Sequence, residues 1–274
     1  MKGRWSSITK GTLFVCATPI GNLKDISKRL IETLQSVDLI ACEDTRKFQI
    51  LANEFQIQKP CISLEKFNES SRIKTLQTKL DKGKNIALIS EAGTPGIADP
   101  GAYLINNLTN NHTITPIPGP CAITTLLSVS GLLADQYLFA GFFPKSESLA
   151  KKELLKFNPL NTPIIYFESP KRMLKTCEFL KKNLPDTPLI IGKELTKKFE
   201  TIIYTTTTNS IEKLTNIPIK GEWVFIIKPD KKNENEVNEK INKLKKLSLT
   251  NKDISTICKI FGLPKNKVYD QLIH

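Results

Sequence analysis

Residues 86–101 decide the fold, and they read Ile-Ala-Leu-Ile-Ser-Glu-Ala-Gly-Thr-Pro-Gly-Ile-Ala-Asp-Pro-Gly. The apolar start predicts a buried strand, and the glycines and prolines after it predict a loop leading to a helix from Ala102. Glycine allows the backbone to approach a ligand closely, and proline stiffens the loop. Ligands of open α/β sheets bind where strands end in such loops, so this stretch predicts a binding site; an ordinary tight connection is the alternative.

The first half of the chain repeats this strand, loop and helix order. Further apolar runs predict strands at residues 12–17, 37–42, 61–64 and 113–117, and loops with glycine or proline follow at residues 18–22 and 118–122. After the first loop we expect a helix with Asp25 at or near its N-cap and Ile26, Leu30 and Leu34 on its inner face. The repetition predicts a largely parallel sheet with helices packed around it.

The second half has several strand candidates without long helices between them, which favours a mixed sheet. These candidates are residues 163–167, 189–191, 201–207 and 223–227. A polar linker at residues 229–236 precedes helical patterns at residues 237–247, 253–261 and 266–272. We therefore expect an α/β protein with an N-terminal α/β domain (1–130), a second α/β domain (131–229) and a small basic helical module (237–274).

Composition sets outer limits on function. The net charge of +13 and the pI near 9.4 favour a polyanionic partner such as RNA, although a lysine-rich genome bias explains the same balance. There is no run of 18 apolar residues, so no membrane span is expected. Six scattered cysteines (Cys16, Cys42, Cys61, Cys121, Cys177, Cys258) predict reduced, buried thiols in a cytoplasmic protein, and with two histidines a zinc site is not expected.

Several common catalytic signatures are absent from the sequence. It contains no Gly-x-Gly-x-x-Gly, no Gly-x-x-x-x-Gly-Lys-Ser/Thr, no Gly-x-Ser-x-Gly and no His-Glu-x-x-His. Their absence disfavours dinucleotide oxidoreductases, ordinary NTPases, serine hydrolases and zinc proteases. What remains is a set of glycine- and proline-rich loops suited to holding a nucleoside-like ligand with backbone groups.

The stretch Glu43-Asp44-Thr45-Arg46 follows the strand predicted at residues 37–42. Two carboxylates and an arginine beside a strand end are candidates for a site. From the spacing alone, the better interpretation is a helix cap with a salt bridge, because Asp44 precedes a helical pattern that runs to about Phe55.

Five motifs, in order, resemble those of the tetrapyrrole-methylase superfamily, and within it the branch that acts on the ribose of 16S ribosomal RNA. The motifs are Ala-Thr-Pro-Ile-Gly-Asn-Leu (17–23), Glu-Asp-Thr-Arg (43–46), Ser-Glu-Ala-Gly-Thr-Pro-Gly-Ile-Ala-Asp-Pro-Gly (90–101), Pro-Gly-Pro (118–120) and Glu-Leu-Thr-Lys (194–197). The match covers nearly the whole chain. Glu91 stands where Asp is more frequent and Cys121 where Ser is common, and neither change removes a group that the chemistry clearly needs.

The resemblance implies two α/β domains with an S-adenosylmethionine cleft between them, and a homodimer. The implied reaction is 2′-O-methylation of a cytidine in the decoding region of 16S rRNA, with the small ribosomal subunit as partner and no metal. It places Pro19, Gly21, Thr94, Gly96, Ile97 and Cys121 around the cofactor, and we expect further contacts near Phe142 and Phe167. Our candidates for the catalytic groups are Asp25, Glu43, Asp44, Arg46 and Glu194, and for RNA contacts Arg29, Lys193, Lys197 and Lys198.

Two other functions stay open at this point. One is carbon methylation of a tetrapyrrole, whose carboxylates would also suit a basic protein. The other is a non-catalytic RNA-binding protein on the same scaffold, which the complete set of glycine- and proline-rich loops disfavours.

Overall fold

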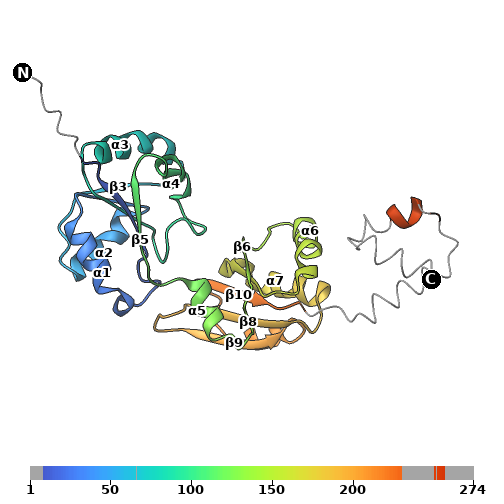
Figure 1. Cartoon of the computed structure of the whole chain (residues 1–274). Coiled ribbons are helices and arrows are strands. Elements are labelled where there is room, and N and C mark those ends of the chain that lie inside the picture. Colours follow the sequence, from blue (N-terminus) through green and yellow to red (C-terminus); the bar gives the residue numbers. More distant parts are fainter. Residues whose placement is uncertain (1–8, 66, 230–249, 251, 257–274) are drawn as a thin grey trace, which may run out of the picture. The chain divides into compact units, whose positions relative to one another are not determined.

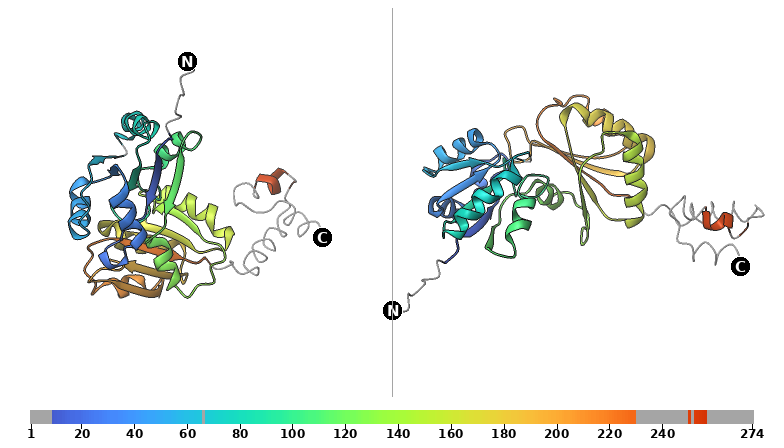
Figure 2. Two further views of the ribbon diagram at one scale, coloured as in Figure 1. Left: turned by 60° about the vertical axis from the view of Figure 1, so that its left-hand side comes forward. Right: turned by 90° about the horizontal axis from the view of Figure 1, so that it is seen from above.

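A computed structural model describes residues 9–65, 67–229, 250 and 252–256. The chain forms two compact units, each built on a five-stranded sheet (Figures 1 and 2). The first unit contains the chain up to Thr125 together with Glu194–Glu200, and the second contains Leu126–Lys193 and the chain from Thr201 onward. The sequence placed a boundary after residue 130, and it gave no sign that Glu194–Glu200 belongs with the first unit.

The sheet of the first unit has the order β3-β2-β4-β1-β5, and every neighbouring pair is parallel, which confirms the prediction for this half. Cys16 at the end of β1 lies opposite both Ile89 at the end of β4 and Ile117 at the end of β5. The carboxyl ends of these strands are therefore level. The strands are β1 (Thr12–Cys16), β2 (Leu39–Cys42), β3 (Cys61–Ser63), β4 (Ile86–Ile89) and β5 (Thr113–Ile117).

Helices cover both faces of this sheet. Helices α1 (Lys28–Ser36) and α2 (Thr45–Glu54) pack on one face, and α3 (Glu69–Asp81) and α4 (Ala102–Leu108) pack on the other (Figure 1). All four residues of β2 are buried, with alternate side chains directed into the two cores. A parallel strand buried on both faces needs such a continuous apolar run.

The start of α1 differs from the prediction. Asp25 does not cap this helix; it is exposed and ends a short 3-10 helix, η1 (Leu23–Asp25). The N-cap of α1 is Ser27, whose hydroxyl accepts a hydrogen bond from the Leu30 N–H at 3.1 Å. Asn22 caps the extra turn with its side chain, which delays the start of α1. Leu30 and Leu34 are buried as predicted, whereas Ile26 is only partly buried.

The thiols are not all buried as predicted. Cys16 and Cys42 are buried in the first unit, and burial raises the pKa of each to about 12. Cys61 is exposed because it begins the short edge strand β3, and Cys121 is half-buried. Cys177 is buried in the core of the second unit.

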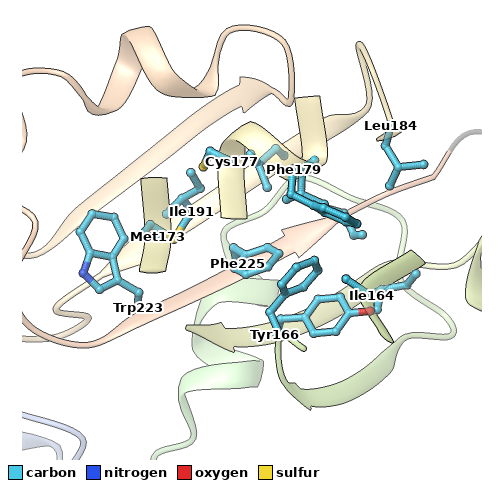
Figure 3. Close-up of a cluster of buried hydrophobic side chains, with 14 of the residues drawn as sticks. Ile164, Tyr166, Met173, Cys177, Phe179, Leu184, Ile191, Trp223 and Phe225 are labelled. Carbon is cyan, nitrogen blue, oxygen red and sulfur yellow. The ribbon is translucent and has the colours of Figure 1, made fainter. Parts of the chain in front are cut away.

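The second unit has the mixed sheet that was predicted. Its order is β6-β7-β10-β8-β9, in which only β6 and β7 are parallel. Side chains on one face, including Tyr166 and Phe225, pack against helices α6, α7 and α8. Figure 3 shows Tyr166 and Phe225 together with Met173, Cys177 and Phe179 of α7 in this core. Its elements are β6 (Leu138–Phe142), α6 (Glu147–Phe157), η2 (Asn158–Leu160), β7 (Ile164–Glu168), α7 (Pro170–Asn183), β8 (Pro188–Lys193), β9 (Thr201–Thr206), α8 (Ser210–Leu214) and β10 (Trp223–Ile227).

Little of the predicted C-terminal module falls within the described residues. Residues 252–256 are helical, inside the helix predicted at residues 253–261. The helices predicted at residues 237–247 and 266–272, all but the first residue of the linker 229–236, and Cys258 lie outside the described residues. Within the described part of the chain, no helix is long and apolar enough to cross a membrane.

Candidate active site at the carboxyl edge of the parallel sheet

Four of the predicted motifs meet at one edge of the first sheet. The loops after β1, β2, β4 and β5 all start from the carboxyl ends of parallel strands, so they gather at the same edge. This edge is where open α/β sheets bind ligands. Helix α5 (Ala122–Ser128) begins directly after the fourth loop and leads from the first unit into the second.

Two of these loops are joined through their backbones. The Thr18 N–H donates to the Gly93 carbonyl at 2.9 Å, and the Gly93 N–H donates back to the Thr18 carbonyl at 3.1 Å. The Ser90 hydroxyl also donates to the Gly93 carbonyl at 3.1 Å. The loop after β1 and the loop after β4 therefore act as a single rigid element.

The loop after β5 is tied to the same element. The Thr94 hydroxyl donates to the Pro120 carbonyl at 3.2 Å. A Cβ atom on Gly119 would lie 2.9 Å from the Ala17 carbonyl oxygen, so only glycine permits this approach. Three loops thus form one connected surface, built mostly from backbone groups.

The predicted cofactor residues lie on these loops. Gly96 has a φ of +80°, which favours glycine, and among the described residues a Cβ atom built on it meets nothing closer than the Ala102 nitrogen at 4.0 Å. The part of the chain that the structure describes leaves this space open, so a ligand can approach the Gly96 backbone. Pro19 is buried, whereas Ile97 and Cys121 are half-buried. The Cys121 carbonyl accepts from the Thr125 N–H at 2.9 Å and so begins α5.

A buried carboxylate supports the loop after β4 from behind. Glu69 of α3 is 8% exposed, and its Oε1 accepts from the Leu104 N–H at 2.8 Å and the Gly101 N–H at 3.2 Å. These are amide groups at the start of α4 that have no partner within the helix. No sequence motif predicted this role, because Glu69 is 32 residues from Gly101 in the chain.

Asp44 and Arg46 form the helix cap that their spacing favoured. The Asp44 carboxylate accepts from the Arg46 N–H at 2.8 Å, and the Arg46 guanidinium donates to it at 2.9 and 3.2 Å. These hydrogen bonds and the Arg46 charge lower the pKa of Asp44 to about 2. A carboxylate with that pKa is a weak proton acceptor at neutral pH.

The neighbouring carboxylates have different surroundings. Glu43 is half-buried at the end of β2. Glu91, in the loop after β4, is exposed and forms an ion pair with Lys47 of α2. This pair links α2 to the loop after β4 at the surface. Asp25 is exposed on η1, beside the loop after β1.

Glu194 and Lys197 belong to this edge as well. A Cβ atom on Gly21 would lie 2.3 Å from Lys197 Cγ, so the lysine stem lies directly against the Gly21 backbone. The Lys197 ammonium is 2.9 Å from Glu194 Oε1. The structure thus brings the fifth motif against the first, across a long separation in the sequence.

The predicted RNA contacts have unequal access to solvent. Lys198 is exposed, with its ammonium 5.6 Å from the centre of the Phe199 ring. Arg29 is exposed and donates to the Pro116 carbonyl at 2.7 Å. Lys193 is only 5% exposed, and its ammonium lies over the Trp223 ring at 5.9 Å. Lys193 therefore lacks the exposed ammonium that the predicted RNA contact requires, because it ends the inner strand β8.

Phe142 and Phe167, the residues near which further cofactor contacts were expected, lie on adjacent strands of the second unit. Their ring centres are 5.7 Å apart in an edge contact, and Phe139 packs against Phe167 at 5.0 Å. Phe142 is 60% exposed. The strands β6 and β7 therefore present an accessible aromatic surface near their carboxyl ends.

Comparison with known proteins agrees with this architecture. Residues 12–211 match the family model of the Tetrapyrrole (Corrin/Porphyrin) Methylases. A Buchnera aphidicola protein named Ribosomal RNA small subunit methyltransferase I is 41% identical over 273 residues, covering 96% of this chain and 94% of its own length. A Haemophilus influenzae protein of the same name is 36% identical over 269 residues, covering 94% of this chain and 95% of its own length.

Solved structures show the same fold at low sequence identity. The methyltransferase CobJ has a TM-score of 0.61 at 14% identity, with 80% of this chain and 94% of that chain covered. A diphthine synthase has a TM-score of 0.60 at 14% identity, with 79% of this chain and 89% of that chain covered. The family match over residues 12–211 and the relatives above one-third identity lead to one conclusion: the chain belongs to the tetrapyrrole methylase family.

Proposed function

We propose that this protein methylates the 2′-oxygen of a cytidine ribose in the decoding region of 16S ribosomal RNA. The methyl donor is S-adenosylmethionine, which tetrapyrrole methylases use. The observation that carries the proposal is the pair of relatives named for methylation of small-subunit ribosomal RNA, each aligned over more than nine-tenths of both chains. The choice of cytidine and of the 2′-oxygen rests on the motif resemblance.

The strand-end loops suit this methyl donor. The donor is a nucleoside that carries a sulfonium and an amino acid group, and backbone N–H and carbonyl groups can hold all of these. Gly96 leaves its backbone open to such a ligand, and Thr94 and Gly93 are fixed by hydrogen bonds to the neighbouring loops. Pro19, Gly21, Ile97 and Cys121 complete the residues that we assign to the cofactor.

When bound, S-adenosylmethionine supplies a methyl group on a positively charged sulfur, ready for in-line displacement. The task of the protein is then to align the ribose hydroxyl and to help it lose its proton. Asp44 is poorly suited to accept that proton, because its pKa is about 2 and both oxygens are bound by Arg46. Glu43, Asp25 and Glu194 remain as candidate acceptors, and Arg46 as a contact at the substrate entrance.

Lys197 is the cation that we assign to the developing charge on the ribose oxygen. Its stem lies against Gly21, and its ammonium is 2.9 Å from Glu194. A fixed ammonium stabilises negative charge that appears only in the transition state. Lys198 and Arg29 are exposed and serve as contacts to RNA phosphates, where a positive charge acts without base specificity.

The test is methyl transfer to a defined nucleotide. The full-length protein is mixed with S-adenosylmethionine labelled in the methyl group and with small ribosomal subunits that lack the modification, and the labelled nucleotide is mapped. Subunits that already carry the modification serve as the control. The proposal expects label on the ribose of one decoding-region cytidine in the first sample and none in the control.

Three other outcomes would each change the assignment. Label on a base or at another nucleotide would overturn the 2′-oxygen assignment and leave an RNA methyltransferase. Cofactor binding without transfer to subunits or to free 16S rRNA would redirect the search to tetrapyrrole substrates. Absence of cofactor binding would leave a protein that only binds RNA.

A further inference from the structure

Glu194–Glu200 contains two residues with an unusual backbone. Glu194 has a φ of +50° and Thr196 has a φ of +67°. For a β-branched residue such as Thr196, this left-handed conformation is a genuine outlier. It persists only where the surrounding structure holds it in place, and such residues concentrate at functional sites.

Two hydrogen bonds hold Thr196 in this conformation. Its hydroxyl oxygen accepts from the Asn22 N–H at 3.1 Å, and its own N–H donates to Glu200 Oε2 at 2.5 Å. Within the segment, the Lys197 N–H donates to the Glu194 carbonyl and the Glu200 N–H donates to the Lys197 carbonyl, both at 3.0 Å. The segment is thus a compact pair of turns attached to the first unit through Thr196.

The attachment point is the loop after β1. Asn22 follows Gly21, against which the Lys197 stem lies, and the Asn22 side chain caps η1 by accepting from the Lys24 N–H at 3.1 Å. The Thr196 hydroxyl therefore binds the Asn22 backbone, and the next residue, Lys197, packs on Gly21. This double attachment leaves the Lys197 ammonium little freedom to move relative to the loop.

We propose that Thr196 and Glu200 are positioning residues, which hold the Glu194–Lys197 ion pair against residues 21–22 for methyl transfer. The proposal rests on the proposed function, because it assigns these residues to the alignment of Lys197. Glu200 fixes the backbone of Thr196, and the Thr196 hydroxyl fixes the distance to the loop. The strained backbone is retained because a relaxed one would turn Lys197 away from Gly21.

Replacement of Thr196 by glycine distinguishes an effect on the stability of the protein from an effect on the position of Lys197. Glycine adopts a φ of +67° without strain, so T196G relieves the backbone while removing the hydroxyl that binds Asn22. We expect T196G to melt close to the wild-type temperature, because the relieved strain offsets the lost hydrogen bond. We expect it to lower kcat about five- to tenfold, the effect of one lost hydrogen bond. T196S keeps the hydroxyl and is the matched control, with kcat close to wild type.

Glu200 offers a second, independent pair of variants. E200Q keeps an oxygen that can accept from the Thr196 N–H, whereas E200A does not. We expect E200A to lower kcat and E200Q to restore most of it. The Kd for S-adenosylmethionine, measured by calorimetry, should stay within about twofold of wild type in all four variants, since one hydrogen bond to the cofactor would change it more.

A readout without catalysis tests the attachment itself. In T196G the backbone N–H of Asn22 loses its acceptor, so the hydrogen exchange of this group, followed by NMR, should accelerate about fivefold or more. The exchange rate of the same group in T196S should resemble that in wild type. Unchanged exchange at Asn22 would overturn the proposed attachment even if the wild-type enzyme transferred no methyl group. If the wild-type enzyme transfers methyl groups and kcat is unchanged in T196G and E200A, the positioning role is overturned and the proposed function stays intact.

Discussion

Thr18 and Gly93 exchange two backbone hydrogen bonds, 2.9 Å in one direction and 3.1 Å in the other, although 75 residues separate them. Gly93 has a φ of +79°, and a Cβ atom on it would lie 3.1 Å from the Ile20 side chain. The first and third motifs are therefore parts of one surface, whose geometry depends on a residue without a side chain. The predictions below follow from this surface and its supports.

Replacement of Gly96 by alanine should weaken cofactor binding beyond its effect on stability. Gly96 and Gly131 both have a positive φ, +80° and +70°, and an added Cβ on either has no described atom closer than 4.0 Å. Each alanine variant should lose about 1 kcal/mol of unfolding free energy through backbone strain. Only G96A should raise the Kd for S-adenosylmethionine, by about tenfold in calorimetry, because its methyl group points into the space left for the ligand. Equal Kd values for G96A and G131A would contradict the placement of the cofactor at Gly96.

Replacement of Glu69 by alanine should destabilise the first unit strongly. The substitution leaves two buried amide groups, those of Gly101 and Leu104, without an acceptor. We expect a loss of about 2 to 4 kcal/mol in urea unfolding. E69Q keeps an oxygen acceptor and should lose less than half as much. If the two variants unfold alike, the carboxylate does not act through these hydrogen bonds.

The Asp44–Arg46 pair should make a pH-dependent contribution to stability. The pKa of Asp44 is lowered to about 2 in the folded protein, below its value near 4 in an unfolded chain. Its contribution is therefore complete above about pH 4 and disappears as the pH falls through about 2. The difference in melting temperature between wild type and D44N, which keeps a capping side chain, should shrink over that interval. A difference that is independent of pH would show that the charge of Asp44 is not involved.

The same pKa predicts how D44N affects catalysis. Because Asp44 remains ionised at neutral pH, it does not titrate in the range where a general base would act. The pH profile of methyl transfer should therefore keep its shape between about pH 6 and pH 9 in D44N. Loss of an acidic limb in the profile of this variant would identify Asp44 as a base after all.

Replacement of Lys198 by glutamine should weaken RNA binding in a salt-dependent way. Lys198 is exposed, so its loss should leave the melting temperature unchanged. The slope of log Kd against log salt concentration should fall by about 0.7 to 0.9, the value for one phosphate contact. K213Q changes another exposed lysine, on α8, and is the control. Equal slopes for the two variants would remove Lys198 from the RNA-binding surface.

The sequence alone determined the parallel sheet and most of the mixed sheet, and it predicted where the candidate site lies. Short apolar runs predicted the described strands except β6 (Leu138–Phe142), which was not predicted. The run that forms β4 was clear because a strand buried on both faces has no polar residues to obscure it. The parallel arrangement of the first sheet was predicted from the helices between its strands. The loops at the strand ends were then predicted to hold a ligand, since this placement follows from chain direction alone.

Only the tertiary structure decided which side chains meet. Glu69 reaches Gly101, Thr196 reaches Asn22, and Lys193 is enclosed beside Trp223, although no local pattern indicates any of these contacts. The left-handed φ of Thr196 is disfavoured for a β-branched residue, and a contact to Asn22, distant in the chain, helps to hold it. Local propensities act over a few residues, whereas these contacts depend on the packing of whole elements, and that packing exists only once the chain has folded.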